Sequence, residues 1–143
     1  ATTTTTVEAN IVSSLNIVAQ NGVIFGDISV SSIAGTVSID TSGSRTATGG
    51  VTINTSTSGS PANFEVSGAP NGLYVITLPS SVTITSAAGD TMTVDNFDSL
   101  PNTNGTLDAG GTESLSIAAR LNVGSFQAFG AYSGLMATTV EYN

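Results

Sequence analysis

Chemistry in this chain can rest only on carboxylates, hydroxyls and two arginines. The 143 residues include 10 acidic side chains and only two cations, Arg45 and Arg120, and they contain neither His nor Cys. This composition excludes Ser-His-Asp and Cys-His nucleophiles, the usual zinc and copper ligand sets, and any disulfide framework. Any function of the chain must therefore rest on carboxylates, hydroxyls, the two arginines or the main chain.

Four carboxylates, Asp90, Asp95, Asp98 and Asp108, are concentrated in one region of the sequence. Ca²⁺ takes oxygen ligands of this kind, but the spacing matches no EF-hand loop, so a solvated acidic face is the favoured interpretation. Paired carboxylates could also serve a glycosidase. No aromatic platform for a sugar accompanies them and Trp is absent. We therefore expect no enzyme, no metal and no other cofactor.

The composition indicates an all-β, extracellular type of protein. The length suits one domain, and charged residues make up only 8 % of the chain while hydrophobic residues make up 39 %. Polarity comes mainly from Thr and Ser, and β-branched Thr is favoured on the exposed face of strands. The net charge of −8 argues against partners such as nucleic acid or an anionic membrane surface, and no apolar run is long enough to span a bilayer.

Alternation of apolar and polar residues with a period of two recurs along the chain, bounded by Gly, Pro, Asn and Asp. It predicts a sandwich or a barrel, and the number of short strands favours two packed antiparallel sheets. One stretch, Glu113–Arg120, is also compatible with a helix. The predicted strands are Val7–Ala19, Val23–Val30, Gly35–Ile39, Gly50–Ile53, Ala62–Ser67, Tyr74–Leu78, Ser81–Thr85, Thr91–Asp95, Ser114–Val123 and Gly130–Tyr142.

The N-terminal segment has the pattern of a strand without a local partner. A run of Thr leads into Val7, Ala9 and Ile11, which alternate with polar Glu8 and Asn10. Thr-rich ends are usually frayed. The alternation nevertheless favours a strand that buries one face.

The segment Gly130–Tyr142 also alternates, and it contains neither Lys nor Pro. Proteins normally protect an exposed edge strand with such residues or with a cover, because its unpaired main chain invites pairing with another strand. We therefore expect another segment to cover this edge.

From Leu15 onward, ordered motifs make the chain resemble a bacterial domain family of unknown function, DUF4402, over roughly residues 15–143. The resemblance rests on motifs that include Phe25-Gly26, Gly35-Thr36-Val37, Phe64-x-Val66-x-Gly68, Tyr74-x-Ile76-x-Leu78-Pro79, Met92-Thr93-Val94, Leu121-x-Val123-Gly124, Gly130-x-Tyr132-Ser133-Gly134 and Val140-x-Tyr142-Asn143.

A second resemblance is to the pilins of chaperone–usher pili, which carry a penultimate Tyr and a Gly fourteenth from the end. Tyr142 and Gly130 occupy these positions. The resemblance implies an immunoglobulin-like antiparallel β-sandwich that is incomplete and is completed by a donor strand from a neighbouring subunit. Many such subunits carry a disulfide between early strands, which this chain lacks, so the subfamily stays open.

On this interpretation residues 1–14 are a donor-strand extension that ends in a Ser13-Ser14 joint, and residues 15–143 are the pilin-like domain. The expected donor face consists of Thr3, Thr5, Val7, Ala9 and Ile11. The expected acceptor groove includes Gly130, Tyr132, Met136, Val140 and Tyr142, with Gly130 leaving room for the incoming strand.

The expected function is that of a structural subunit of an extracellular filament, polymerising by donor-strand exchange for adhesion or biofilm formation. The partners would be copies of the same chain, and the resemblance implies a periplasmic chaperone and an outer-membrane usher. A start at Ala1, without Met or an apolar leader, agrees with export to a Gram-negative cell surface through a cleaved signal peptide. The alternative is a self-contained, secreted carbohydrate- or surface-binding β-sandwich module whose N-terminal strand folds back into its own sheet.

Overall fold

The computed structural model describes residues 1–143, and all of its regular elements are β-strands in antiparallel sheets. No helix is present that could cross a membrane. The strands are β1 (Asn16–Asn21), β2 (Ile28–Ser29), β3 (Gly35–Ile39), β4 (Arg45–Gly49), β5 (Thr52–Ile53), β6 (Ala62–Ser67), β7 (Leu73–Thr77), β8 (Ser81–Ser86), β9 (Thr91–Leu100), β10 (Asn104–Thr106), β11 (Thr112–Val123), β12 (Tyr132–Ser133) and β13 (Thr139–Tyr142).

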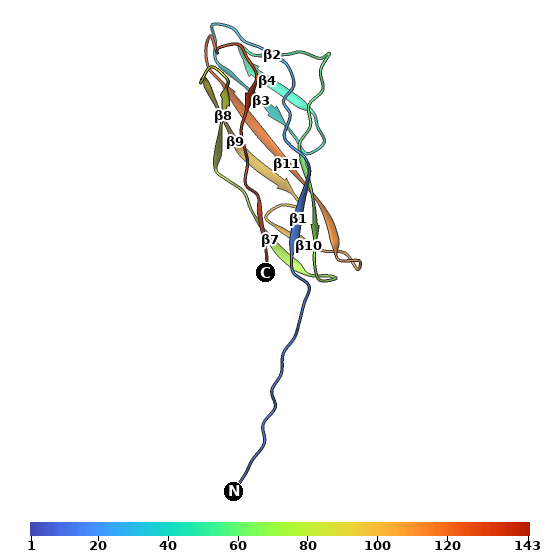
Figure 1. Cartoon of the computed structure of the whole chain (residues 1–143). Helices are drawn as coiled ribbons and strands as arrows, with labels where there is room; N and C mark the ends of the chain where they lie inside the picture. The colour runs from blue at the N-terminus through green and yellow to red at the C-terminus, as the bar shows by residue number, and fades with distance from the viewer.

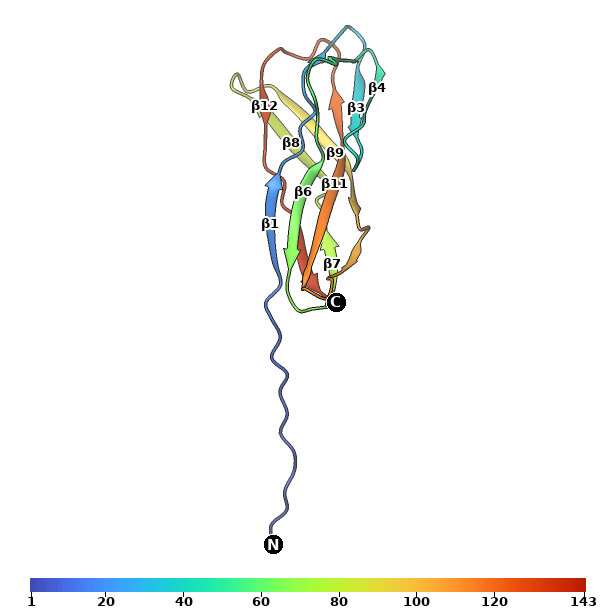
Figure 2. The same cartoon turned by 90° about the vertical axis from the view of Figure 1, so that its right-hand side faces the viewer.

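The largest sheet has eight strands and is organised around β11. Its main path runs β1-β6-β11-β9-β8-β12. Strand β3 pairs with the part of β11 that extends beyond β6, and β4 pairs with the other side of β3. Alternate residues of β11, including Leu115, Ile117 and Leu121, are buried, as a strand with one core face requires. The sheet curls, so that β1 and β12, the two ends of its main path, lie on the same side of the domain (Figure 2).

Two small sheets pack against the large one and divide the core into two clusters. The sheet β10-β7-β13 contributes Tyr74 and Ile76 to a lower cluster with Val66 and Leu115. The sheet β2-β5 contributes Ile28 and Ile53 to the partly buried rim of an upper cluster that includes Val37, Val94 and Leu121. Both clusters therefore share β11 as their common wall.

A single bulge interrupts the pairing of β11 with β9. Ala118 pairs with Asp98 and Arg120 pairs with Asp95, so one residue of β11 faces two of β9. Asn96, one of these two residues of β9, has a φ of 52°. Such a bulge bends the strand and increases its twist, in agreement with the curl of the sheet.

Several predicted elements are confirmed and others are wrong. β3 and β6 have the predicted bounds, and Glu113–Arg120 is strand rather than helix. The prediction that a strand begins at Val7 is wrong, because β1 begins at Asn16, where β6 first offers a partner. Strands β4 and β10 were not predicted. The predicted strand Gly130–Tyr142 is broken into β12 and β13.

The N-terminal segment, residues 1–14 and here called the arm, lies outside every strand. It projects from one end of the domain along the long axis (Figures 1 and 2). We call this end the base and the opposite end, where the chain passes from β11 to β12, the top. The arm residues are exposed, and Val7 and Ile11 each keep 95 % of their surface accessible.

Candidate functional site

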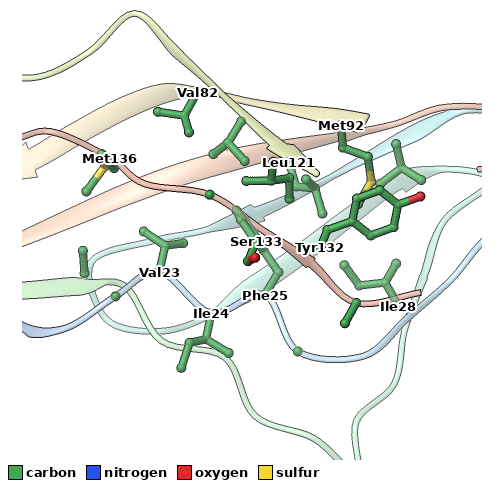
Figure 3. A pocket seen from close by; sticks show the side chains of 18 of the residues that line it. Val23, Ile24, Phe25, Ile28, Val82, Met92, Leu121, Tyr132, Ser133 and Met136 are labelled. Atoms are coloured by element: carbon green, nitrogen blue, oxygen red, sulfur yellow. The ribbon is translucent and has the colours of Figure 1, made fainter. Parts of the chain in front are cut away.

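A long apolar groove lies between β1 and β12, the two ends of the main path of the large sheet (Figure 3). It encloses about 920 Å³, and 21 of its 29 lining residues are hydrophobic. One wall lies within residues 21–30, from the end of β1 onward, and the other is formed by residues 127–136, which include β12. Residues of β8, β9 and β11 form the floor, among them Val82, Ile84, Met92, Val94 and Leu121.

The floor residues of the groove differ in how far they are buried. Val94 and Leu121 are buried, whereas Val82, Ile84 and Met92 on the adjoining strands remain partly exposed although they belong to the rim of the upper cluster. Each faces the groove, where no segment of this chain covers it. The upper cluster is thus only partly covered over β8 and β9.

The first wall is attached to the rest of the domain on its outer side only. Ile24 exchanges two main-chain hydrogen bonds of 2.9 Å with Ser60. Alternation then directs Val23 and Phe25 toward the groove (Figure 3). The amide and carbonyl of Val23 make no hydrogen bond within the chain.

Arg45 positions this wall. Its guanidinium donates to the carbonyl oxygen of Phe25 at 2.8 Å, to that of Asn54 at 3.4 Å, and also to that of Thr57. The fork of donors joins the first wall to the loop after β5 without any carboxylate partner. Because several donors are held at fixed angles, Lys could not replace this arginine.

The second wall is fastened to β8 at its centre. Tyr132 and Ser133 pair with Ser86 and Thr85. Gly134 then approaches β8 so closely that a Cβ there would lie 2.8 Å from the carbonyl oxygen of Thr83. Only glycine allows this approach, and it keeps the wall against the floor.

Beyond that point the second wall has no main-chain partner. None of residues 134–137 takes part in a main-chain hydrogen bond, and the buried hydroxyl of Thr138 also has no partner. Val23 in the first wall and residues 134–137 in the second therefore have free main-chain donors and acceptors beside the apolar groove. An extended segment whose alternate residues are apolar can satisfy both, by main-chain pairing and by side-chain burial.

The structure brings together three of the five residues predicted for the acceptor site. Gly130, Tyr132 and Met136 line the groove. Val140 and Tyr142 instead lie in β13, where they pair with Ile76 and Tyr74 of β7. Val140 also packs against the lower cluster.

The backbone gives a second reason for a glycine at Gly130. A Cβ at this position would meet only the Cβ of Ser86, at 3.7 Å, which is an ordinary contact. The φ of 146° favours glycine here. Space for an incoming strand at this position stays a prediction.

The five predicted donor residues, Thr3, Thr5, Val7, Ala9 and Ile11, all lie in the exposed arm and away from the groove of their own chain. The sequence prediction missed the first wall and the floor. The alternation in Val23–Val30 was visible, but only the sheet order shows that this segment faces residues 127–136.

Tyr142 does not line the groove but holds the joint between the arm and the domain. Its hydroxyl donates to the carbonyl oxygen of Ser13 at 2.7 Å and accepts from the amide of Ala69 at 2.7 Å. The phenol ring lies over Gly68, where a Cβ would be 2.3 Å from the hydroxyl oxygen. The point at which the arm leaves the base is therefore fixed.

The four clustered aspartates of the sequence are held apart in the structure, and no group of three or more acidic side chains forms a metal-binding arrangement. Asp95 binds Arg120 through bonds of 3.0 and 3.3 Å, which lower the pKa of the carboxyl. Asp108 accepts bonds from the amides of Thr112 and Gly110 in a turn, which also lower its pKa. These aspartates organise turns and strand pairs separately.

A protein-family model described as "Domain of unknown function (DUF4402)" matches residues 15–142, which is the whole domain without the arm. No curated protein and no solved structure matches the chain.

Proposed function

The chain belongs to the DUF4402 family, and we propose that it is a structural subunit of an extracellular filament, assembled by donor-strand exchange. In this proposal the domain is an immunoglobulin-like β-sandwich that lacks one strand, and the arm of one copy occupies the groove of the next. The filament would serve adhesion or biofilm formation on a Gram-negative cell surface. A periplasmic chaperone and an outer-membrane usher would assist assembly, and the subunit itself would have no catalytic role.

The proposal rests on two features of the same chain. One is an apolar groove that no segment covers, and the other is an N-terminal arm of alternating residues that pairs with no strand. The groove has apolar floor residues, and Val23 in one wall and residues 134–137 in the other make no main-chain hydrogen bond. The arm has alternating apolar residues, of which Val7 and Ile11 are almost fully exposed. The groove lacks a covering strand, and the arm lacks a strand to pair with.

The direction of the arm favours exchange between copies over insertion into its own domain. Tyr142 holds Ser13 at the base, and from there the arm continues away from the domain (Figure 1). To reach its own groove the arm would have to reverse direction at the joint and run beside β1. A second copy placed along the axis can receive it without any change of direction.

Burial of the arm explains how such an assembly would persist. Each Val or Ile side chain that becomes buried contributes about 1.5–3 kcal/mol, which alone would give a modest affinity. The inserted strand also covers Val82, Ile84 and Met92 and completes the upper cluster. Dissociation then requires part of the core to open, so the filament is kinetically stable.

The proposal is tested by negative-stain microscopy and by electrophoresis in SDS without heating. The full chain should form filaments that migrate as a ladder. The variant V7D/I11D should form none, because two carboxylates would have to be buried in the apolar trough. The matched control N10D adds charge on the opposite face of the arm and should assemble.

Filaments formed equally well by V7D/I11D would contradict the proposal. A full chain that stays monomeric under all assembly conditions, including with a cognate chaperone and usher, would favour the self-contained binding module instead.

A further inference from the structure

We infer that consecutive subunits also meet end to end, through a contact between the aromatic loop at the top of one domain and the base of the domain that donates the arm. This inference rests on the proposed function and adds a second interface to it. The loop comprises Phe126–Phe129, and the facing surface of the partner copy is formed by Leu73 and Tyr142.

The top of the domain presents large apolar side chains to solvent. Phe126 and Phe129 keep 77 % and 92 % of their surface accessible. Ile33 keeps 64 %, and it lies two residues after Ser31, whose carbonyl oxygen is bonded to the amide of Phe126. The loop lies where the chain arches from β11 to β12 (Figure 2). Together with Val30 and Ser31 it encloses a small apolar hollow of about 270 Å³.

The loop is held in place with its aromatic rings outward. The amide of Phe126 donates to the carbonyl oxygen of Ser31 at 2.8 Å, and Phe126 has a φ of 50°, which is costly for an aromatic residue. The side chain of Gln127 accepts from the amide of Gly124 and donates to the carbonyl oxygen of Thr91, both at 3.1 Å. These bonds maintain a strained conformation whose evident result is the exposure of two phenyl rings.

The base has a smaller apolar surface beside the root of the arm. Leu73 is 54 % exposed, and its carbonyl oxygen accepts from the amide of Asn143 at 3.0 Å. Tyr142, the preceding residue, is 37 % exposed and holds Ser13. Any neighbour that receives the arm must therefore approach this surface.

The direction of the arm determines which end of the neighbour approaches. In a filament that grows by repeating one contact, all subunits have the same polarity. The arm points from the base along the long axis (Figures 1 and 2). A neighbour of the same polarity beyond the base therefore presents its top, and the arm enters its groove from that end.

The length of the arm determines how closely the two ends approach. The second wall of the groove comprises ten residues, 127–136, and a strand that covers them spans about 33 Å at ~3.3 Å per residue. The arm before Ser13 has twelve residues, or about 40 Å. An arm that fills the groove from end to end leaves about 7 Å between the groove and Ser13, a gap that side chains of the base and the top can bridge.

The experiment uses the absence of Cys from the natural chain. The full-chain variant F126C/L73C is assembled and treated with a short bis-maleimide, then denatured fully by heating in SDS; Phe126 is chosen because Phe129 also lines the groove. We expect a ladder of covalent oligomers. F126C, L73C and the matched pair F126C/V18C should give none, since Val18 is similarly exposed but lies in β1 on the body of the domain.

A second variant, F126S, removes one exposed ring without touching the groove lining or the buried core. We expect it to form filaments through its intact groove but with a loss of straightness, measured as a shorter persistence length. Filaments that show no ladder in F126C/L73C and no change in F126S would overturn the end-to-end contact and leave donor-strand exchange standing. If the full chain forms no filament, both proposals fail.

Discussion

The Tyr142 hydroxyl is bonded to the Ser13 carbonyl oxygen at 2.7 Å, across 129 residues of sequence. The Tyr142 hydroxyl oxygen also accepts from the amide of Ala69 at 2.7 Å, so one hydroxyl joins β13, the loop after β6 and the root of the arm. This contact gives the arm a fixed exit from the domain. A flexible arm anchored only at β1 would have no defined direction.

Replacing Tyr142 by Phe should loosen this joint while keeping the ring over Gly68. Two hydrogen bonds are lost, each contributing about 0.5–1.5 kcal/mol, so the free energy of unfolding should fall by about 1–3 kcal/mol. That corresponds to a decrease in Tm of roughly 3–12 °C for a domain of this size. Differential scanning calorimetry measures it, and an unchanged Tm would show that the bond to Ser13 is not formed in solution.

The two arginines should differ sharply in their effect on stability. R45M leaves the carbonyls of Phe25 and Thr57 without their donor and should lower the free energy of unfolding by about 2–4 kcal/mol. R120M removes only an exposed ion pair with Asp95 and should cost at most about 1 kcal/mol. Urea unfolding of both variants makes the comparison, and equal midpoints would mean that Arg45 does not hold the groove wall.

Gly134→Ala should displace the second wall from the floor. The added Cβ would lie 2.8 Å from the Thr83 carbonyl oxygen and 3.0 Å from the Ile84 side chain, and overpacking of this kind costs about 1–3 kcal/mol. G22A is the matched control, because nothing lies within 4 Å of a Cβ there. Thermal unfolding should separate the two, and a G134A as stable as G22A would contradict the packing of β12 on β8.

Stability should decrease in acid. Hydrogen bonds from Ser42 to Asp40, from Arg120 to Asp95 and from Thr112 to Asp108 hold the pKa of each carboxyl below its ordinary 3.8. The folded state therefore binds these protons less readily than the unfolded state does. The stabilisation is complete above about pH 4 and is lost as the pH falls through the lowered values.

The variant D40N/D95N/D108N tests this prediction, because it removes the three carboxyl groups. Its Tm should vary less with pH between about 4 and 2 than that of the natural chain. An identical acid dependence in both proteins would show that other carboxylates control it.

Period-two alternation predicted most of the fold because burial of one face controls where strands form. β3, β6 and β11 show this plainly, since their apolar residues alternate and are buried. β4 and β10 could not be predicted in the same way. β4 is an edge strand of small and polar residues, and β10 contains Gly105, which leaves space for the ring of Tyr74.

The groove could be predicted only in part. The pilin resemblance and the alternation together predicted Gly130, Tyr132 and Met136, but Val140 and Tyr142 follow the same pattern and pair with β7 instead. Alternation specifies which face of a strand is apolar. It does not specify which strand lies opposite, and this depends on contacts distant in sequence such as those of Ile24 with Ser60.

The most direct measurement is a cryo-electron microscopy reconstruction of filaments assembled from the full chain. The account predicts a strand of density in each groove, between residues 21–30 and 127–136, with Val7 and Ile11 facing the floor. That density should continue into Ser13 of the adjacent subunit. An empty groove, or one filled by the arm of its own domain, would contradict donor-strand exchange.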